Sequence, residues 1–186
     1  MDILIRKAKQ SDARGIVEVN TYTWLTTYKG LMPDEILDNR VKTIEDRVSK
    51  TANSIREKDN AYVVIDNDKV IGIMSYGKSR NEEYPESGEI YSIYILEEYQ
   101  GLGLGKKLFM IGINELINEG YNTMILNVLN GNNTIKFYEK YCGKKVGEKQ
   151  DNFGDTILTE SIMHFDNLED IYSKFNVDKN DLSKNL

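Results

Sequence analysis

The chain has 186 residues, of which 40% are apolar and 29% are charged, a composition typical of a single globular domain. Its formal net charge of −6 and its lack of a basic cluster argue against nucleic-acid binding and favour a cationic partner such as an amine. Because Cys142 is the only cysteine and His164 the only histidine, and no apolar run near the N-terminus suits a signal peptide or a membrane span, we expect a cytoplasmic protein without disulfide, metal or membrane partner.

The first part of the chain predicts one short strand followed by helices. Residues 3–8 alternate in the manner of a strand, and Ser11 and Asp12 offer N-cap oxygens to a helix that reaches about Tyr28. Pro33 fits the first turn of a second helix, and a third, mostly polar helical segment follows it.

The next part of the chain is rich in β-forming residues. Residues 61–65 and 70–76 flank the turn sequence Asp-Asn-Asp-Lys at 66–69, which predicts a hairpin. After an acidic loop, residues 89–96 form another apolar strand. We therefore expect three consecutive strands before the middle of the chain.

Three alternating glycines separate that strand from the next helix. Gly101, Gly103 and Gly105 let the backbone approach an anion, and the start of the helix supplies unpaired N–H donors and a favourable dipole. A Rossmann fingerprint needs a further glycine where Lys106 or Leu108 stands. A Walker A loop also fails, because it ends in Ser or Thr where this chain has lysine. The glycines predict a pyrophosphate site of a different kind.

The last part of the chain returns to strands. Residues 123–129 predict a strand, 133–140 a helix, and 144–149 with 157–165 a second hairpin. From residue 167 onward the sequence predicts a short helix and a frayed, charged end.

Two motifs together resemble a known family. Residues 100–105 read QGLGLG and fit the pattern Q/R-x-x-G-x-G/A, and residues 132–140 read NNTIKFYEK, which is similar to N-x-A-x-x-F-Y-E-K. They lie about 30 residues apart, as they do in the GCN5-related N-acetyltransferase (GNAT) superfamily, which the chain resembles over residues 1–165.

The resemblance implies an α/β fold in a single domain. Its mixed, mostly antiparallel central sheet would have about seven strands, splayed between strands 4 and 5 and flanked by helices, and residues 166–186 would form a helical, charged tail. Acetyl-CoA would be the co-substrate, with its pantetheine arm in the splay. The resemblance assigns acetyl-CoA binding to Ile93, Tyr94, Ile95, Gln100, Gly101, Leu102, Gly103, Leu104, Gly105, Lys106 and Asn132. Asn132 could equally act as a plain helix cap.

The resemblance also implies how acetyl transfer would proceed. As in the family, a backbone N–H of the splayed fourth strand, around Tyr94 and Ile95, would polarise the thioester carbonyl, and Tyr138 is the candidate to protonate the thiolate. The thiol and phenol pKa values of ~8.5 and ~10 differ by only about 2 kcal/mol in free energy. Glu89 matches the base position of the histone-acetylating branch, with Glu160 and loop carboxylates as rivals. The alternatives are a packed aromatic for Tyr138 and a surface charge for Glu89.

The acceptor is the least determined part of the function. Trp24 and Tyr28 share one helix face and resemble the pocket wall of bacterial small-molecule acetyltransferases, although both could simply be core aromatics. We expect direct transfer, in a ternary complex, to a small cationic amine such as a polyamine, an amino acid or an antibiotic. The alternatives are a non-catalytic acyl-CoA-binding sensor and a protein N-terminal acetyltransferase. The final hairpin could pair two subunits in a homodimer.

Overall fold

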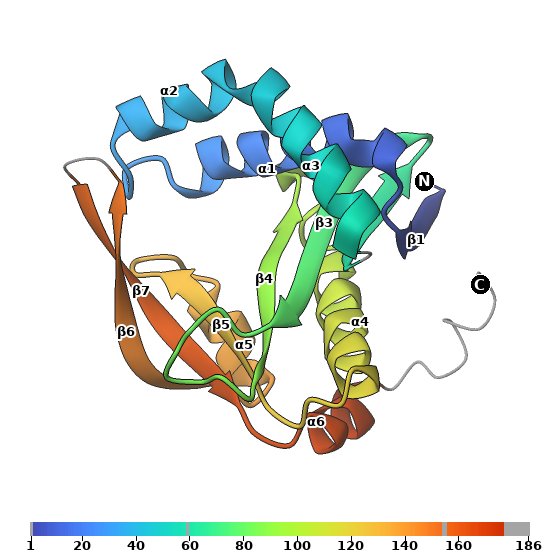
Figure 1. The fold of residues 1–186 in the computed structure, drawn as a ribbon, viewed down its shortest axis with the longest axis vertical. Coiled ribbons are helices and arrows are strands. Elements are labelled where there is room, and N and C mark those ends of the chain that lie inside the picture. The colour runs from blue at the N-terminus through green and yellow to red at the C-terminus, as the bar shows by residue number, and fades with distance from the viewer. Residues whose placement is uncertain (1, 59, 154–155, 177–186) are drawn as a thin grey trace.

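A single seven-stranded sheet organises the protein (Figure 1). The computed structural model describes residues 2–58, 60–153 and 156–176. The sheet has the order β1-β2-β3-β4-β5-β7-β6, in which only β4 and β5 run parallel. Its strands are β1 (Ile3–Lys7), β2 (Ala61–Asp66), β3 (Lys69–Lys78), β4 (Gly88–Ile95), β5 (Met124–Leu129), β6 (Lys144–Phe153) and β7 (Thr156–Phe165). The expected α/β fold with a mixed, mostly antiparallel sheet is confirmed.

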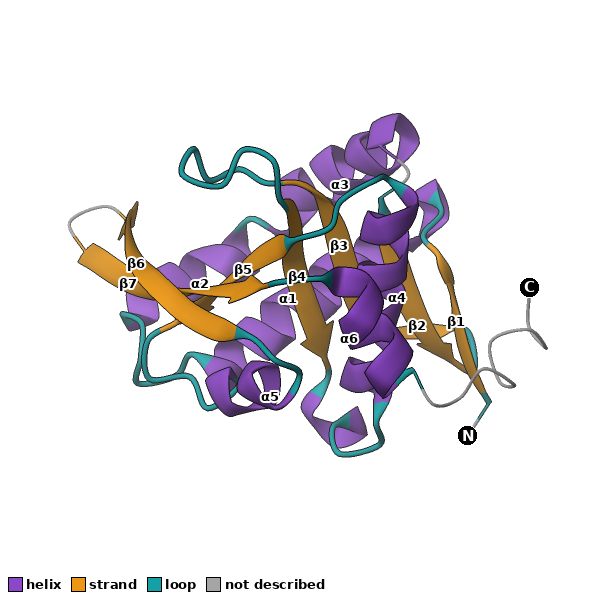
Figure 2. Ribbon diagram, turned by 90° about the horizontal axis from the view of Figure 1, so that it is seen from below, coloured by secondary structure: helices purple, strands orange, loops and turns teal. Residues whose placement is uncertain are grey.

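Helices cover both faces of the sheet (Figure 2). The helices are α1 (Ala13–Thr27), α2 (Asp34–Lys42), α3 (Ile44–Lys58), α4 (Leu104–Asn118), α5 (Ile135–Lys140) and α6 (Leu168–Phe175). The first three lie on one face and the last three on the other. No helix in residues 2–58, 60–153 and 156–176 has the length and apolar character to cross a bilayer.

The sheet opens between β4 and β5. These strands pair only through Gly88 with Met124 and Glu89 with Ile125, and then diverge (Figure 1). A parallel pair needs a crossover connection, and here α4 supplies it by packing against the sheet. The expected splay between the fourth and fifth strands is therefore present.

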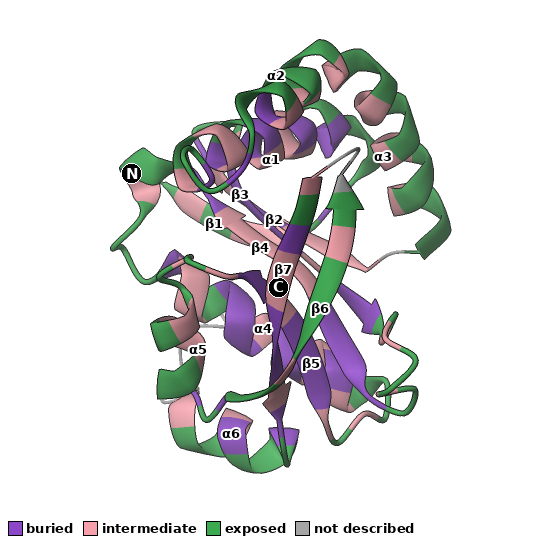
Figure 3. Cartoon of the chain, turned by 90° about the vertical axis from the view of Figure 1, so that its left-hand side faces the viewer, coloured by how far each residue is buried: buried purple, intermediate pink, exposed green. Residues whose placement is uncertain are grey.

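The main core lies between α4 and the sheet. Leu108, Phe109, Ile113 and Leu116 of α4 are fully inaccessible to solvent, in agreement with the broad apolar face expected for this helix. Figure 3 shows buried residues in α4 and along β5, whereas α3 is largely exposed or intermediate. The helix α4, which begins directly after Gly103 of the glycine loop, is therefore packed into the core.

The local structure differs from expectation at the start of α1. Asp12 does not cap that helix, because its carboxylate accepts hydrogen bonds from the Arg6 guanidinium at 2.7 and 2.9 Å and from the Lys9 backbone N–H at 2.7 Å. An ion pair with β1 wins over the cap because it joins two charged groups. A 3-10 turn, Gln10–Asp12, precedes α1 instead.

The final segments extend further than the sequence suggests. The second hairpin runs to Phe153 on β6 and resumes at Thr156 on β7. Leu168 and Ile171 of α6 are buried in the main core, so this helix packs with the rest of the domain. The frayed, charged end predicted beyond it, residues 177–186, lies outside the described residues.

Candidate active site

The glycine loop connects β4 to α4 and leaves open space above its backbone. Gly101 and Gly103 have φ angles of 76° and 77°, in the left-handed region that favours glycine. A Cβ atom built on Gly101, Gly103 or Gly105 would meet no other atom within 4 Å. The loop can therefore be approached closely from outside.

The first turn of α4 presents unpaired donors. The Lys107 N–H closes on the Gly103 carbonyl at 3.1 Å, but no residue in the described part of the chain accepts from the N–H groups of Leu104, Gly105 or Lys106. The Gln100 side chain donates to the Ile95 carbonyl at 3.0 Å and so links the loop to the last residue of β4. The start of the 15-residue helix α4 thus offers backbone N–H donors at the place where the sequence predicts a pyrophosphate site.

The edge of β4 that faces the gap is irregular. The pairing of β3 with β4 shifts between Ser75 and Tyr76, which leaves Tyr91 as the extra residue of a bulge. Beyond it, Ile93, Tyr94 and Ile95 keep their register with β3, so their other edge is directed toward the divergence from β5. These are the positions expected to orient a thioester.

Two aromatic side chains from α1 and its C-cap lie at the end of this gap. The Trp24 and Tyr28 rings meet edge to face, with centroids 5.0 Å apart and an interplanar angle of 82°. Trp24 Nε1 donates a hydrogen bond of 3.0 Å to the Tyr94 hydroxyl. Burial, and then Tyr94, raise the pKa of Tyr28 well above that of an ordinary phenol.

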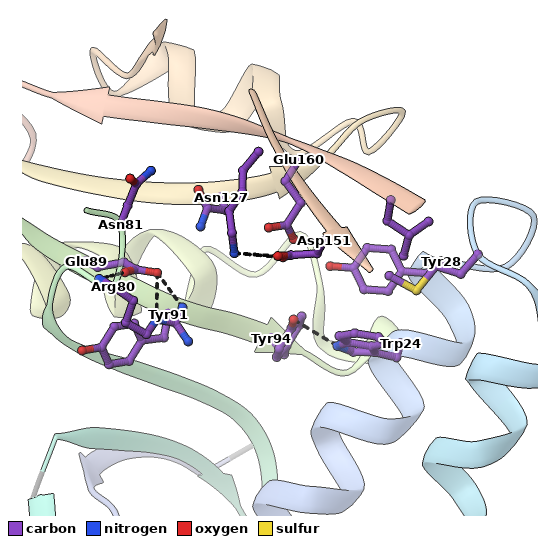
Figure 4. A pocket seen from close by; sticks show the side chains of 13 residues that line it. Trp24, Tyr28, Arg80, Asn81, Glu89, Tyr91, Tyr94, Asn127, Asp151 and Glu160 are labelled. Atoms are coloured by element: carbon purple, nitrogen blue, oxygen red, sulfur yellow. Dashed lines mark hydrogen bonds and ion pairs between the residues drawn. The ribbon is translucent and has the colours of Figure 1, made fainter. Parts of the chain in front are cut away.

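These aromatics line a cavity of about 300 Å³ between the two halves of the sheet (Figure 4). Its walls come from α1 and the loop after it, from β4 and the loop that precedes it, and from β5, β6 and β7. The lining residues are Trp24, Tyr28, Met32, Arg80, Asn81, Glu89, Tyr91, Tyr94, Asn127, Lys149, Asp151, Leu158 and Glu160. The structure therefore brings Trp24, Tyr28, Tyr94 and Glu89, all singled out in the sequence, to one cavity.

Glu89 sits in the cavity wall with both carboxylate oxygens engaged. It is only 1% exposed. One oxygen accepts from the Arg80 backbone N–H at 2.7 Å, and the other accepts from Arg80 Nε and Nη2 at 3.1 and 2.5 Å. The Arg80 guanidinium also stacks over the Tyr91 ring, 4.2 Å from its centroid. Glu89 therefore holds Arg80 in place at the narrow end of the gap.

A second carboxylate, Glu160 on β7, is less occupied. Burial, followed by the nearby Asp151 carboxylate, raises the pKa of Glu160 above its usual value. Asp151 pairs with Lys149, whose Nζ lies 2.8 Å from a carboxylate oxygen. The Asn127 side-chain oxygen is buried and has no partner within the described residues. Carboxylates and an unsatisfied acceptor on this side of the cavity suit a ligand that donates hydrogen bonds.

Tyr138 and Asn132 are not among the residues that line this cavity. Tyr138 packs in an aromatic cluster, with its ring centroid 5.7 Å from that of Phe109 and 6.4 Å from that of Phe165. Burial, and then Tyr94, raise the pKa of Tyr138 well above its usual value. The Asn132 side-chain oxygen accepts from the Thr134 N–H at 3.0 Å, in the turn that precedes α5.

Several cavity residues escaped the sequence interpretation. Arg80, Asn127, Lys149 and Asp151 belong to no motif, and the approach of the last three depends on the insertion of β7 between β5 and β6. One signal was present. Asn127 interrupts the otherwise apolar strand sequence of β5, MILNVL, and a polar residue at such a position needs a partner or a function.

Comparison with known proteins identifies the family. The model of the acetyltransferase (GNAT) family matches residues 19–144. The chain belongs to this family. An uncharacterized N-acetyltransferase of Bacillus subtilis (strain 168), YuaI, is 33% identical over 153 residues, which cover 81% of this chain and 84% of YuaI. The protein is accordingly a GNAT enzyme of the acetyl-CoA-dependent N-acetyltransferase class.

Solved structures share the GNAT fold. The PaiA N-acetyltransferase of Thermoplasma acidophilum, in complex with coenzyme A, superposes with a TM-score of 0.66 at 21% identity and covers 89% of this chain and 99% of its own. An N-acetyltransferase from Staphylococcus aureus Mu50 gives 0.69 at 23%, with the same coverage of 89% and 99%. YncA of Salmonella typhimurium, with acetyl-CoA, gives 0.64 at 19% and covers 89% of this chain and 94% of its own.

Proposed function

We propose that this GNAT enzyme transfers the acetyl group of acetyl-CoA directly to a small cationic amine held in the cavity between the two halves of the sheet. One observation supports this most strongly: the splay of β4 from β5 is flanked by the acidic, half-buried Glu160 and by the aromatic pair Trp24 and Tyr28. The volume of about 300 Å³ suits a small molecule.

The cofactor would lie along the edge of β4. Its pyrophosphate would accept from the free N–H groups of Leu104, Gly105 and Lys106, beside the open space over Gly103. Its pantetheine amides would pair with the unpaired edge of residues 93–95, and the Asn132 amide group would donate to one of them while its oxygen stays bound to the Thr134 N–H. The bound coenzyme A of PaiA and acetyl-CoA of YncA support this assignment.

The acceptor amine would be drawn by charge and by π faces. Glu160 and Asp151 lie on one side of the cavity, and Trp24 and Tyr28 on another (Figure 4). An ammonium group placed between them gains both an ionic and a cation–π interaction. The same carboxylates would repel an acidic acceptor, so we expect amines without a neighbouring anionic group to react best.

The geometry suggests a role for each group in the reaction. Glu160 takes a proton from the ammonium, directly or through water, and the neutral amine attacks the thioester carbonyl. A backbone N–H of β4 near Tyr94 polarises that carbonyl. As the C–N bond forms and the C–S bond breaks, Tyr138 donates its proton to the thiolate, and the proton leaving the acetylated nitrogen restores the phenol.

Glu160 is favoured over Glu89 as the base because of what each carboxylate already binds. Three hydrogen bonds from Arg80 already engage both carboxylate oxygens of Glu89, whereas burial and Asp151 raise the pKa of Glu160. The role of Glu89 as the general base, which the sequence suggests, stays a prediction. The two substitutions Glu89→Gln and Glu160→Gln distinguish between the two carboxylates.

A panel of amines tests the reaction itself. Release of free thiol from acetyl-CoA is measured with polyamines, amino acids, aminoglycosides and a peptide N-terminus, against matched alcohols. The exposed thiol of Cys142, the only cysteine, adds a fixed background of one equivalent per enzyme. Turnover with small cationic amines is expected. Binding of acetyl-CoA without turnover of any amine would instead favour the non-catalytic sensor.

Two matched glycine substitutions test the cofactor site. Gly103 and Gly120 both have positive φ and open surroundings, so aspartate introduces the same strain and charge at either position. Gly103→Asp should weaken acetyl-CoA binding at least tenfold through repulsion of the pyrophosphate, whereas Gly120→Asp, at the other end of α4, should leave it unchanged. Isothermal titration measures both, and equal affinities in the two variants would reject the loop assignment.

A further inference from the structure

Two arginines meet between α1, α2 and α3 without an acidic partner. Arg40 of α2 and Arg47 of α3 both donate to the side-chain oxygen of Asn20 on α1. Arg47 also donates to the Thr21 hydroxyl at 2.8 Å and to the Arg40 carbonyl at 3.2 Å. Within residues 2–58, 60–153 and 156–176, neither guanidinium forms an ion pair with a carboxylate.

The Arg40 and Arg47 guanidiniums thus carry positive charge without a carboxylate partner, and both are partly shielded from water. Burial, and then repulsion by Arg47, lower the pKa of Arg40 to about 10, and burial lowers that of Arg47. Both groups remain protonated at neutral pH. The Arg40 Nε is buried and has no hydrogen-bond partner among the described residues. Two like charges that share one neutral acceptor are costly unless an anion joins them.

The two guanidiniums line a cavity of about 320 Å³ that has no lining residue in common with the candidate active site. It lies between α1, α3 and the strands β2, β3 and β4. Part of its wall is apolar, through Ile16, Ile55 and Ile73, and Thr51 and Ser54 of α3 also line it. A ligand that fits this wall has an apolar body and one anionic end.

We propose that this second cavity is a binding site for a small organic carboxylate, whose anionic end is held by Arg40 and Arg47 and whose apolar body packs against Ile16, Ile55 and Ile73. A carboxylate matches the planar donor fork of arginine, and the apolar walls disfavour a fully hydrated inorganic ion.

The same cavity has a built-in spectroscopic reporter. The Arg40 guanidinium carbon lies 3.5 Å from the centroid of the Trp24 ring, and Trp24 is the only tryptophan of the chain. An anion that binds the Arg40 guanidinium changes the electric field at the Trp24 ring and therefore its fluorescence. Binding can thus be followed without any assay of acetyl transfer. Trp24 also lines the candidate active site, so this contact joins the two cavities.

Fluorescence titration of the full chain tests the proposal. Sodium hexanoate is the probe, hexanamide its neutral counterpart, and inorganic phosphate the anion without an apolar body. Hexanoate should change the Trp24 emission saturably and bind at least tenfold more tightly than hexanamide or phosphate. The proposal is overturned if hexanoate gives no saturable change, if hexanamide binds as tightly, or if phosphate binds as tightly.

Substitutions on α3 locate the site. Arg47→Gln should weaken hexanoate binding at least tenfold, and Arg47→Lys, which keeps the charge but loses the fork, by a smaller factor. Arg56→Gln removes an exposed positive charge from the same helix and should change nothing. Circular dichroism verifies folding, and Arg47→Lys carries the test where Arg47→Gln does not fold. Unchanged hexanoate affinity in the folded Arg47 variants would reject this location.

Discussion

Tyr94 lies near two other tyrosines at the splay, Tyr28 and Tyr138, whose pKa values are raised. After burial itself, Tyr94 contributes to raising the pKa values of both Tyr28 and Tyr138, and Tyr138 adds to that of Tyr28. All three rings come from different elements, α1's C-cap, β4 and α5. A phenol with a raised pKa stays protonated throughout the neutral range, so Tyr138 is available as a proton donor at any pH at which the enzyme is stable.

Removal of the Tyr138 hydroxyl should therefore slow catalysis without loss of cofactor. Tyr138→Phe is expected to lower kcat about 100-fold, the usual size of a general-acid contribution, and to leave the Kd of acetyl-CoA unchanged. Tyr141→Phe is the control, because Tyr141 is buried in the same aromatic cluster, 5.6 Å from Phe109 between ring centroids. Steady-state rates and calorimetry measure both variants. An unimpaired rate in Tyr138→Phe would exclude the acid role.

The pH dependence of the rate should identify the base. Glu160 acts only when deprotonated, and burial with Asp151 raises its pKa, so kcat/KM should rise with pH through a value above the usual ~4.3 for glutamate. In Glu160→Gln this rise of kcat/KM with pH, the acid limb of the profile, should vanish, and kcat/KM should fall about 100-fold. Glu89→Gln should keep the limb. The reverse pattern, with the limb lost only in Glu89→Gln, would make Glu89 the base.

At the scale of elements, the placement of α5 depends on a glycine. A Cβ atom on Gly143 would come within 2.6 Å of the Phe165 ring and 2.9 Å of the Tyr138 carbonyl oxygen. The chain leaves α5 through this point, and the Gly143 N–H donates to that same carbonyl at 2.9 Å. The position of the helix that carries Tyr138 is thus fixed by the close contact of the Gly143 backbone with the Phe165 side chain of β7.

A methyl group at this point should destabilise the fold. Gly143→Ala is expected to lower the free energy of unfolding by about 1–3 kcal/mol through overpacking. Gly147→Ala on β6 is the matched control, because the nearest atom to its new Cβ, on Ile162, lies at an ordinary 3.7 Å. Urea denaturation gives both values. Equal stability of the two variants would show that α5 shifts freely.

The elements differ in how far the sequence alone predicts them. The glycine loop and α4 follow from local rules, because left-handed glycines and helix starts depend on neighbouring residues only. The approach of Asn127, Asp151 and Glu160 depends on strand order and register, which bring β5, β6 and β7 together over long separations. The engagement of Glu89 by Arg80 is of the same kind: the strand was predictable, the partner was not.

At the scale of the molecule, the proposed cofactor would bridge two halves of one sheet. β1 to β4 and β5 to β7 are joined through two residue pairs and through the core beneath α4. A ligand that spans the gap adds contacts to both halves at once, and it stabilises only the folded state.

Binding should therefore raise the melting temperature. At 100 times its Kd, acetyl-CoA should add about 2.7 kcal/mol of stability, which corresponds to about 5–10 °C for a chain of this size. Differential scanning fluorimetry measures the shift, with ATP and NAD at the same concentration as comparators. The Gly103→Asp variant, which should bind at least tenfold more weakly, should lose at least about half of this shift. Equal shifts with ATP or NAD would mean that the loop accepts any pyrophosphate.

The divergence of β4 from β5 gives this sheet four edges where an ordinary open sheet has two. The outer pair, on β1 and β6, faces outward, but the inner pair, beyond Glu89 on β4 and beyond Ile125 on β5, faces a gap within the molecule. An outer edge invites any passing strand, and proteins must guard it. An inner edge admits only a thin chain with amide groups of its own. The unpaired backbone groups of β4 and β5 thus lie in a gap within the molecule, where a strand of another protein cannot pair with them.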